Sequence, residues 1–452
     1  MAAALLTVLP AAASAAPPSK PAKPASVEFT SKRPGEALLD VRALAPGTDW
    51  QKAGAESAVV RLELDGHYNQ DVVLFEGAQP FDYKVALGPV GRGRHEVKAS
   101  FDPAKSPAGA SGVEIRSLTP SLGAASGDDA LAQRYSPVVY GRDLGGPYEN
   151  NHTDVPLETY HEVARSSDGR TTLQYTVIWS NEDGGTNTPA LMARWGRTTD
   201  IEWIYSVTLD AAGKIVSEAY QSPNHGTQPF TGARLGDHPM LETGTLNNNM
   251  LQVDDPATAS GYRFIPDTSQ ALPAGRAREA VMDANPWTYL VMAKEMIREG
   301  KVEEPPSAAT PAMSDQRDYL WAEIDKDTSY PAPPSGGSWV GTALQVRLAG
   351  DPQWYTSNHD VPDWSIQRDD PAATTVELPP GRTAADVQAL RAVAVPVASG
   401  TSPPPADYRI DVRSLTRTFF LGTDFLPGSS FAQWQGDAVL TPANPTAVIW
   451  SR

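Results

Sequence analysis

The sequence predicts a mainly β protein built from sandwiches of short antiparallel strands. Its 452 residues include 41 prolines and 36 glycines, residue types that favour turns and interrupt long helices. Short runs that alternate apolar and polar residues recur along the chain, and a period of two is typical of a sheet with one face in water. A single segment, near residue 290, carries the start and stop signals of a helix.

Residues 1–26 indicate export. An apolar stretch follows Met1, and the small residues Ala13-Ser14-Ala15 are typical of a signal-peptide cleavage site. A linker rich in proline, alanine and lysine comes next, although the basic residues that usually precede the apolar stretch are missing. We therefore expect a signal peptide and linker over residues 1–26 and a bacterial protein that is secreted, periplasmic or on the cell surface.

Composition excludes several classes of protein. The formal net charge is −17, which repels phosphate backbones, so we expect no nucleic-acid partner. The absence of cysteine excludes disulfides, thiolate metal sites and a cysteine nucleophile. No apolar run after residue 26 approaches the roughly 20 residues of a membrane span. We expect a monomer without a membrane span.

Residues 27–118 predict a small sandwich. The runs that begin at Val60 and His95 alternate strictly between apolar and polar residues, and turn residues separate them from similar runs. This module resembles the immunoglobulin-like accessory domains of secreted bacterial proteins. A linker rich in serine, glycine and alanine follows over residues 119–129.

Residues 130–452 predict a larger β-sandwich domain with one covering helix. Strands are expected over residues 173–180, 201–209 and 215–220. Pro286 at the first helical position and Gly300 as the stop predict a helix over residues 287–299. A proline-rich loop near residues 301–316 marks a possible further boundary. The strands after it either complete the central sandwich or form a third domain.

Two carboxylates, Asp200 and Glu202, stand at the head of a predicted strand, where the period of two places them on one face. Two acids this close raise each other's pKa unless a cation lies between them. With Asp183 they could bind a divalent cation, Ca²⁺ in preference to Zn²⁺. Equally, they could form a general acid and base pair. In the simplest alternative, Asp200 caps a turn and Glu202 faces solvent.

Two histidines, His225 and His238, lie in turns beside an asparagine and an aspartate. An imidazole oriented in this way suits a general base or a metal ligand, but the same residues are also common in ordinary loops. If His152 lay beside both, a zinc or iron site would be possible.

Amides and indoles complete the candidate site. The run from Asn247 to Asn249 offers amides that suit hydroxyl-rich ligands. Trp195 and Trp203 could stack on sugar faces, although tryptophans in a β-sandwich are more often part of the core. Phosphate-binding loops and dinucleotide fingerprints are missing from the sequence, so we expect no nucleotide cofactor.

Residues 175–226 resemble the necrosis-inducing protein family and the fungal vacuolar-sorting-protein-like family. In the first of these, the motif Gly-His-Arg-His-Asp-Trp-Glu holds a divalent cation inside a β-sandwich. Gly196, Asp200 and Glu202 match that motif, and His225 with Gly226 matches a downstream His-Gly.

The sequence departs from the family motif at three positions. Arg197 and Thr199 replace its histidines, and Ile201 replaces its tryptophan. The resemblance implies a non-catalytic, cation-dependent protein that binds glycans or membrane glycolipids, with Asp183 as a further ligand.

These observations favour a secreted hydrolase of an extracellular polysaccharide or glycoconjugate. Asp200 with Glu202 or Asp183 would be the acid and base, and His225 or His238 would assist. No Gly-x-Ser-x-Gly motif is present, which disfavours a serine hydrolase. The alternatives are a non-catalytic, cation-dependent glycan- or glycolipid-binding surface protein and a purely structural surface protein.

Overall fold

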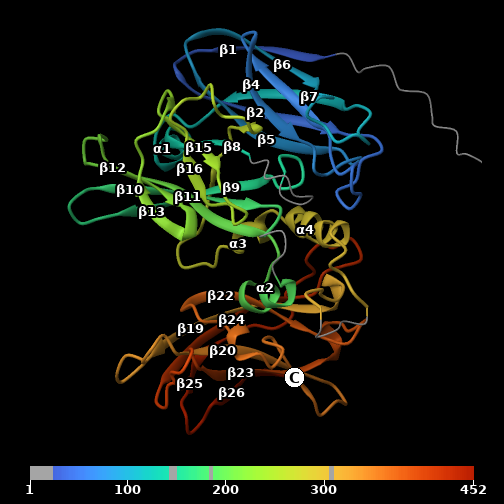
Figure 1. The fold of residues 1–452 in the computed structure, drawn as a ribbon, viewed down its shortest axis with the longest axis vertical. Coiled ribbons are helices and arrows are strands. Elements are labelled where there is room, and N and C mark those ends of the chain that lie inside the picture. The colour runs from blue at the N-terminus through green and yellow to red at the C-terminus, as the bar shows by residue number, and fades with distance from the viewer. Residues whose placement is uncertain (1–23, 142–149, 183–186, 305–309) are drawn as a thin grey trace, which may run out of the picture.

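The computed structural model describes residues 24–141, 150–182, 187–304 and 310–452. It confirms a mainly β protein, in which three groups of strands are stacked along the long axis (Figure 1). The predicted signal peptide and most of its linker, and also Asp183, lie outside the described residues. No helix in the described ranges is long and apolar enough to cross a membrane.

The N-terminal strands form two antiparallel sheets that face each other. Apolar side chains such as Leu39, Val41 and Leu62 alternate with exposed neighbours and fill the space between the sheets. One sheet has the order β1 (Ala25–Ser31), β6 (Gly93–Phe101), β3 (Val59–Leu64) and β4 (His67–Val73). The other has the order β5 (Phe81–Val90), β2 (Gly35–Leu44) and β7 (Glu114–Leu122).

The middle part contains a six-stranded sheet that carries the candidate site. Its order is β13 (Gly226–Pro229), β12 (Ile215–Ser222), β11 (Asp200–Leu209), β10 (Thr171–Trp179), β9 (Pro156–Arg165) and β18 (Gln270–Ala271). A smaller sheet consists of β14 (Arg234–Leu235), β15 (His238–Thr243), β8 (Val138–Tyr140), β17 (Arg263–Phe264) and β16 (Met250–Gln252).

The predicted covering helix is present as α4 (Trp287–Arg298). It follows Pro286 and ends before Gly300, whose φ of 66° suits a residue without a side chain. Three helices that we did not predict are also described: α1 (Asp128–Tyr135), α2 (Thr188–Trp195) and α3 (Ala280–Ala284). Each has eight residues or fewer, too short for a clear helical period.

The C-terminal strands form a sandwich of their own. In the described residues, neither of its sheets contains a strand from before Tyr319, so these strands do not complete the middle sheets. The first sheet has the order β22 (Asp370–Glu377), β19 (Tyr319–Ser329), β24 (Arg409–Phe419) and β25 (Trp434–Leu440). The second has the order β21 (Trp354–Thr356), β20 (Trp339–Leu348), β23 (Val387–Val397) and β26 (Thr446–Ser451).

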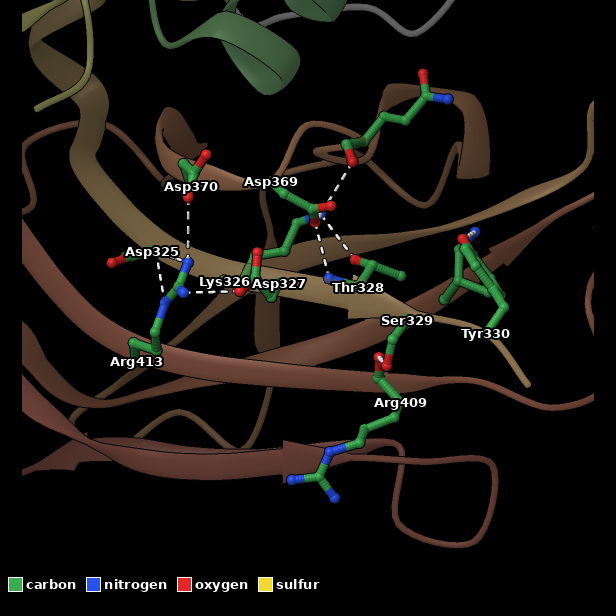
Figure 2. Close-up of polar contacts among 12 residues, drawn as sticks. Asp325, Lys326, Asp327, Thr328, Ser329, Tyr330, Asp369, Asp370, Arg409 and Arg413 are labelled. Carbon is green, nitrogen blue, oxygen red and sulfur yellow. Dashed lines mark hydrogen bonds and ion pairs between the residues drawn. The ribbon is translucent and has the colours of Figure 1, made fainter. Parts of the chain in front are cut away.

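Charged side chains connect the strands of the first C-terminal sheet (Figure 2). Arg413 on β24 pairs with Asp325 at 2.8 Å and with Asp327 at 2.7 Å, both on β19. Between these aspartates, Lys326 is completely buried, and its Nζ lies 2.7 Å from Asp369 Oδ1 and donates to the Gln367 carbonyl at 2.9 Å. Because Gln367 and Asp369 directly precede β22, these two contacts hold β22 against β19.

The three groups of strands pack tightly against one another. The main hydrophobic core is shared by the N-terminal sandwich and the middle part, and Phe75 stacks on Trp287 of α4 with 5.1 Å between ring centroids. At the other junction, Thr374 Oγ1 and Thr375 Oγ1 of β22 donate to carbonyls at the end of α2, at 2.7 and 3.0 Å. The predicted boundary at residues 119–129 therefore separates strands that share a core.

Candidate functional site

Asp200 and Glu202 begin β11 in the centre of the middle sheet. Asp200 is almost completely buried, at 1% exposure, and its Oδ2 accepts a hydrogen bond from Asn248 Nδ2 at 3.0 Å. Asn248 also donates to the Asn181 carbonyl at 3.3 Å. Glu202 is only partly buried, with a side chain that is 14% exposed. Of the two carboxylates, Glu202 is the one that a ligand can reach.

His225 lies over Glu202. Its Nδ1 is 3.8 Å from Glu202 Oε2, and its side chain is 55% exposed. The amide nitrogens of Gln221 and Asn247 lie 3.2 Å from Nδ1 and 2.9 Å from Nε2. The imidazole is therefore held in position while one side of it faces solvent.

The backbone around His225 adopts an uncommon conformation. Asn224 and His225 have φ angles of 62° and 55°, and Asn248 on the opposing loop has a φ of 44°. Non-glycine residues rarely occupy this left-handed region, although asparagine and histidine tolerate it better than most. Such conformations persist where the surrounding structure enforces them, and they gather at ligand sites.

The electrostatic surroundings of Glu202 favour its protonated form. Burial, and then the negative charge of Asp200, raise the pKa of Glu202 to about 7, against the opposing effects of Gln221, Arg278 and Arg197. Glu202 can therefore exchange a proton near neutral pH, as a general acid or base requires.

Arg197, which follows the glycine at the end of α2, is a buried arginine held by two glutamates. Arg197 Nε lies 3.2 Å from Glu279, and its NH1 lies 3.4 Å from Glu182. The preceding Gly196 ends α2 with a φ of 62°, and a Cβ there would lie 2.8 Å from Thr374 N. In this protein the matched glycine thus has a structural role as a helix cap.

The structure places His238 away from Glu202. Its side chain is completely buried on β15, where Nε2 lies 3.0 Å from Glu36 Oε2 and Nδ1 lies 2.8 Å from the Ser136 carbonyl. Because Glu36 belongs to the N-terminal sandwich, His238 connects that sandwich to the middle part. A substrate at Glu202 cannot reach this imidazole.

The two predicted stacking tryptophans also lie elsewhere. Trp203 follows Glu202 directly on β11 and so faces the other side of the sheet. Trp195 ends α2, where its ring contacts the guanidinium of Arg368 at 4.4 Å. By contrast, Asn247 contacts His225 Nε2, and Asn249 Oδ1 approaches the His225 backbone N–H at 3.5 Å. The predicted amides, not the indoles, therefore contact the histidine that lies over Glu202.

The residues around Asp200 offer some oxygen ligands for a cation. The buried Oδ1 of Asn248, next to Asp200, accepts no hydrogen bond within the described residues. Carboxylate and amide oxygens are the ligand types that Ca²⁺ prefers. Within the described ranges, however, no three histidine, aspartate or glutamate side chains form a group that could hold a metal ion, and His152, His225 and His238 are no exception. Asp183 lies outside these ranges.

Sequence analysis missed Gln221 and one partly buried acid, and although it named the asparagine run, it did not predict the contact that Asn248 makes with Asp200. Gln221, at the end of β12, and Asn248, the central residue of the asparagine run, contact His225 and Asp200. Glu158 on β9 lines a cavity of about 410 Å³ between the N-terminal sandwich and the middle sheet. Burial, and then Asp267, raise the pKa of Glu158 to about 8.

No protein-family model and no curated protein matches the chain. Solved structures give partial overlaps. A ruminal GH26 endo-beta-1,4-mannanase shares 15% identity over 23% of this chain and 19% of its own, with a TM-score of 0.17. A family 35 carbohydrate-binding module from an environmental isolate shares 10% identity over 23% of this chain and 72% of its own, with a TM-score of 0.16.

A third overlap involves the tandem CBM51 modules of Sp3GH98, the family 98 glycoside hydrolase from Streptococcus pneumoniae SP3-BS71. It has 10% identity, covers 86% of this chain and 78% of that one, and gives a TM-score of 0.15. This chain covers only 19% of the mannanase, and superposition at these TM-scores carries no argument about function.

Proposed function

We propose that the protein is a secreted hydrolase of an extracellular polysaccharide or glycoconjugate, in which Glu202 is the general acid and His225 is the general base. The observation that carries this proposal is the pairing of a partly buried Glu202 with an exposed His225 across 3.8 Å. Amide groups surround this pair, and amides both donate to and accept from sugar hydroxyls.

The chemistry follows from the exposure of each group. A protonated Glu202 would donate its proton to the oxygen of the leaving group, and His225 would accept a proton from the attacking water. Asp200 is buried behind Asn248 and cannot touch a substrate. It therefore acts as a positioning residue that keeps Glu202 protonated by charge repulsion.

A hydrolysis screen tests this proposal. Wild-type protein and the variant Glu202→Gln would be incubated with a panel of plant, fungal and bacterial polysaccharides, and released reducing ends would be measured. We expect cleavage of at least one substrate, and a loss of about 100-fold or more in the variant. Glu96→Gln, at an exposed position of β6, is the matched control and should keep full activity. No cleavage by wild type, or full activity in Glu202→Gln, would refute the proposal.

The second candidate is a cation-dependent glycan-binding protein without catalysis. It is favoured by the buried Asn248 Oδ1, which accepts no hydrogen bond within the described ranges and lies next to Asp200. A cation bound there would also relieve the repulsion between Asp200 and Glu202. Metal analysis of the purified protein, with thermal melts with and without EDTA, tests it. Stoichiometric Ca²⁺ whose removal lowers Tm and abolishes glycan binding would support this candidate. A purified protein that contains no metal and whose Tm does not change with EDTA would exclude it.

A further inference from the structure

A second, smaller pocket lies where the middle part meets the C-terminal sandwich. It has a volume of about 180 Å³ and is lined by residues from the end of α2, from the segment before α3 and from the segment before β22. Figure 1 shows α2 between the middle sheet and this sandwich. The pocket's walls therefore come from segments far apart in the sequence.

The pocket concentrates positive charge. Its lining includes the arginines Arg197, Arg276, Arg278 and Arg368, against only two carboxylates, those of Glu162 and Glu279. The whole chain has a formal net charge of −17, so its general composition does not explain this local excess of cations. Guanidinium groups brought this close repel one another unless an anion lies between them.

Two of these guanidinium groups form no ion pair within the described residues, although the negative charge of Glu279 acts on Arg368 from a longer distance. Within the described residues, neither Arg278 nor Arg368 has a carboxylate oxygen within 4.0 Å. Arg278 NH1 donates to the Ile201 carbonyl at 2.7 Å, and Arg368 donates to the carbonyls of Arg194 and Ala373. A guanidinium carries more N–H donors than these contacts use, so donors remain for a ligand.

Arg368 is held in a defined orientation. Its guanidinium lies 4.4 Å from the centre of the Trp195 ring, which also contacts Arg197 at 5.8 Å. A guanidinium stacked on an indole keeps its N–H groups at the edges of its plane, where they can form a fork for two oxygens. Burial lowers the pKa of Arg368 to about 10, and the positive charges of Arg197 and Arg278 add to this effect, although Glu279 opposes it. A bound anion would remove this destabilisation.

We propose that this pocket binds a sulfate or phosphate group. Its volume of about 180 Å³ is below the roughly 300 Å³ at which pockets for whole drug-sized ligands begin, so it accommodates the anionic group of a ligand rather than a large molecule. The proposal does not require the hydrolase chemistry, because no hydrogen bond or ion pair joins Arg278 or Arg368 to the side chains of Glu202 and His225 within the described residues, although the charge of Arg278 opposes the rise that burial causes in the pKa of Glu202. Arg278 nevertheless bonds to the backbone between Asp200 and Glu202, so the two sites are physically connected.

Calorimetric titration of the full-length protein tests the proposal. The protein is titrated with sodium sulfate and with sodium phosphate at constant ionic strength, and sodium chloride is the reference. We expect saturable binding of at least one of these ions by wild type. Arg278→Gln and Arg368→Gln should each weaken the affinity about tenfold or more. Arg92→Gln removes the same charge from an exposed position of the N-terminal sandwich and should bind like wild type. Because Arg278 is exposed, its variant is expected to fold even if Arg368→Gln does not.

A sulfated disaccharide in the same titration identifies the source of the anion. Tighter binding than inorganic sulfate, with the same loss in Arg278→Gln, would show that the group is carried on a sugar. Weaker binding would assign the pocket to a free ion, and either result supports the proposal. No saturable binding of any of the three probes, or equal affinity in wild type and both pocket variants, would overturn it.

Discussion

Replacing Glu158 with glutamine should make the protein more stable at alkaline pH. Glu158 lies on β9 in the cavity between the N-terminal sandwich and the middle sheet, where Phe81 and Tyr83 also line the wall. Burial, and then the negative charge of Asp267, raise its pKa from the ordinary 4.5 to about 8, while Lys84 partly offsets the increase. Glutamine keeps the shape of the side chain and never carries the charge.

The sign and size of the effect follow from the two pKa values. Because the folded-state pKa is raised, the associated stability is fully present below pH 4.5 and is lost as the pH rises through about 8. At about 1.4 kcal/mol for each pKa unit, the largest possible loss is about 5 kcal/mol. The side chain is partly exposed, and solvent screening reduces the expected loss to about 2 kcal/mol.

Urea unfolding measures this loss of stability at two pH values, about 5 and about 9.5. Most of the titration of Glu158 falls between them. Wild type and Glu158→Gln should have nearly equal free energies of unfolding at the lower pH. At the higher pH the variant should be more stable by about 2 kcal/mol. Glu96→Gln, on an exposed face, controls for the loss of a carboxylate. Equal differences between wild type and Glu158→Gln at the two pH values would refute the reasoning.

Three further predictions concern other buried or site residues. His238→Ala should lower the free energy of unfolding by about 2–3 kcal/mol in urea, because it empties a fully buried position and removes the partner of the partly buried Glu36; a loss below about 0.5 kcal/mol would contradict this role. Lys326→Ala should lower the free energy of unfolding, measured by thermal unfolding, by about 2–4 kcal/mol. Lys326→Met should lower it clearly less, because methionine fills the buried volume without a charge. Equal losses in the two variants would show that the charge, not the volume, matters. If Glu202 is the acid, kcat should fall as the pH rises through about 7; a rate that instead increases through that pH would argue for a base.

Local signals in the sequence predicted the fold class and several elements. Pro286 and Gly300 mark the ends of α4 because capping and backbone preferences depend on adjacent residues. The period of two placed Asp200 and Glu202 on one face of β11 for the same reason. Helix α2 was missed, although Asn187, Pro189 and Gly196 provide its caps. Its eight residues are too few for a helical period.

The composition of the candidate site depended on contacts that the sequence does not record. His225 reaches Glu202 because β12 pairs with β11, and the turn that follows β12 carries the histidine. His238 was predicted to lie in a turn, as His225 does, yet it begins β15 and packs against Glu36, 202 positions earlier in the chain. Two histidines with similar local sequences thus have different surroundings, and only packing distinguishes them.

The sequence by itself therefore determined the mainly β class, the covering helix and the shared face of the two carboxylates, since periodicity and capping act between near neighbours. Tertiary structure alone decided which carboxylate is exposed, which histidine accompanies it and where the tryptophans point. It also brought Arg197, Arg278 and Arg368 into one pocket. Burial and electrostatic interactions depend on distances in space, and packing sets those distances between residues that are far apart along the chain.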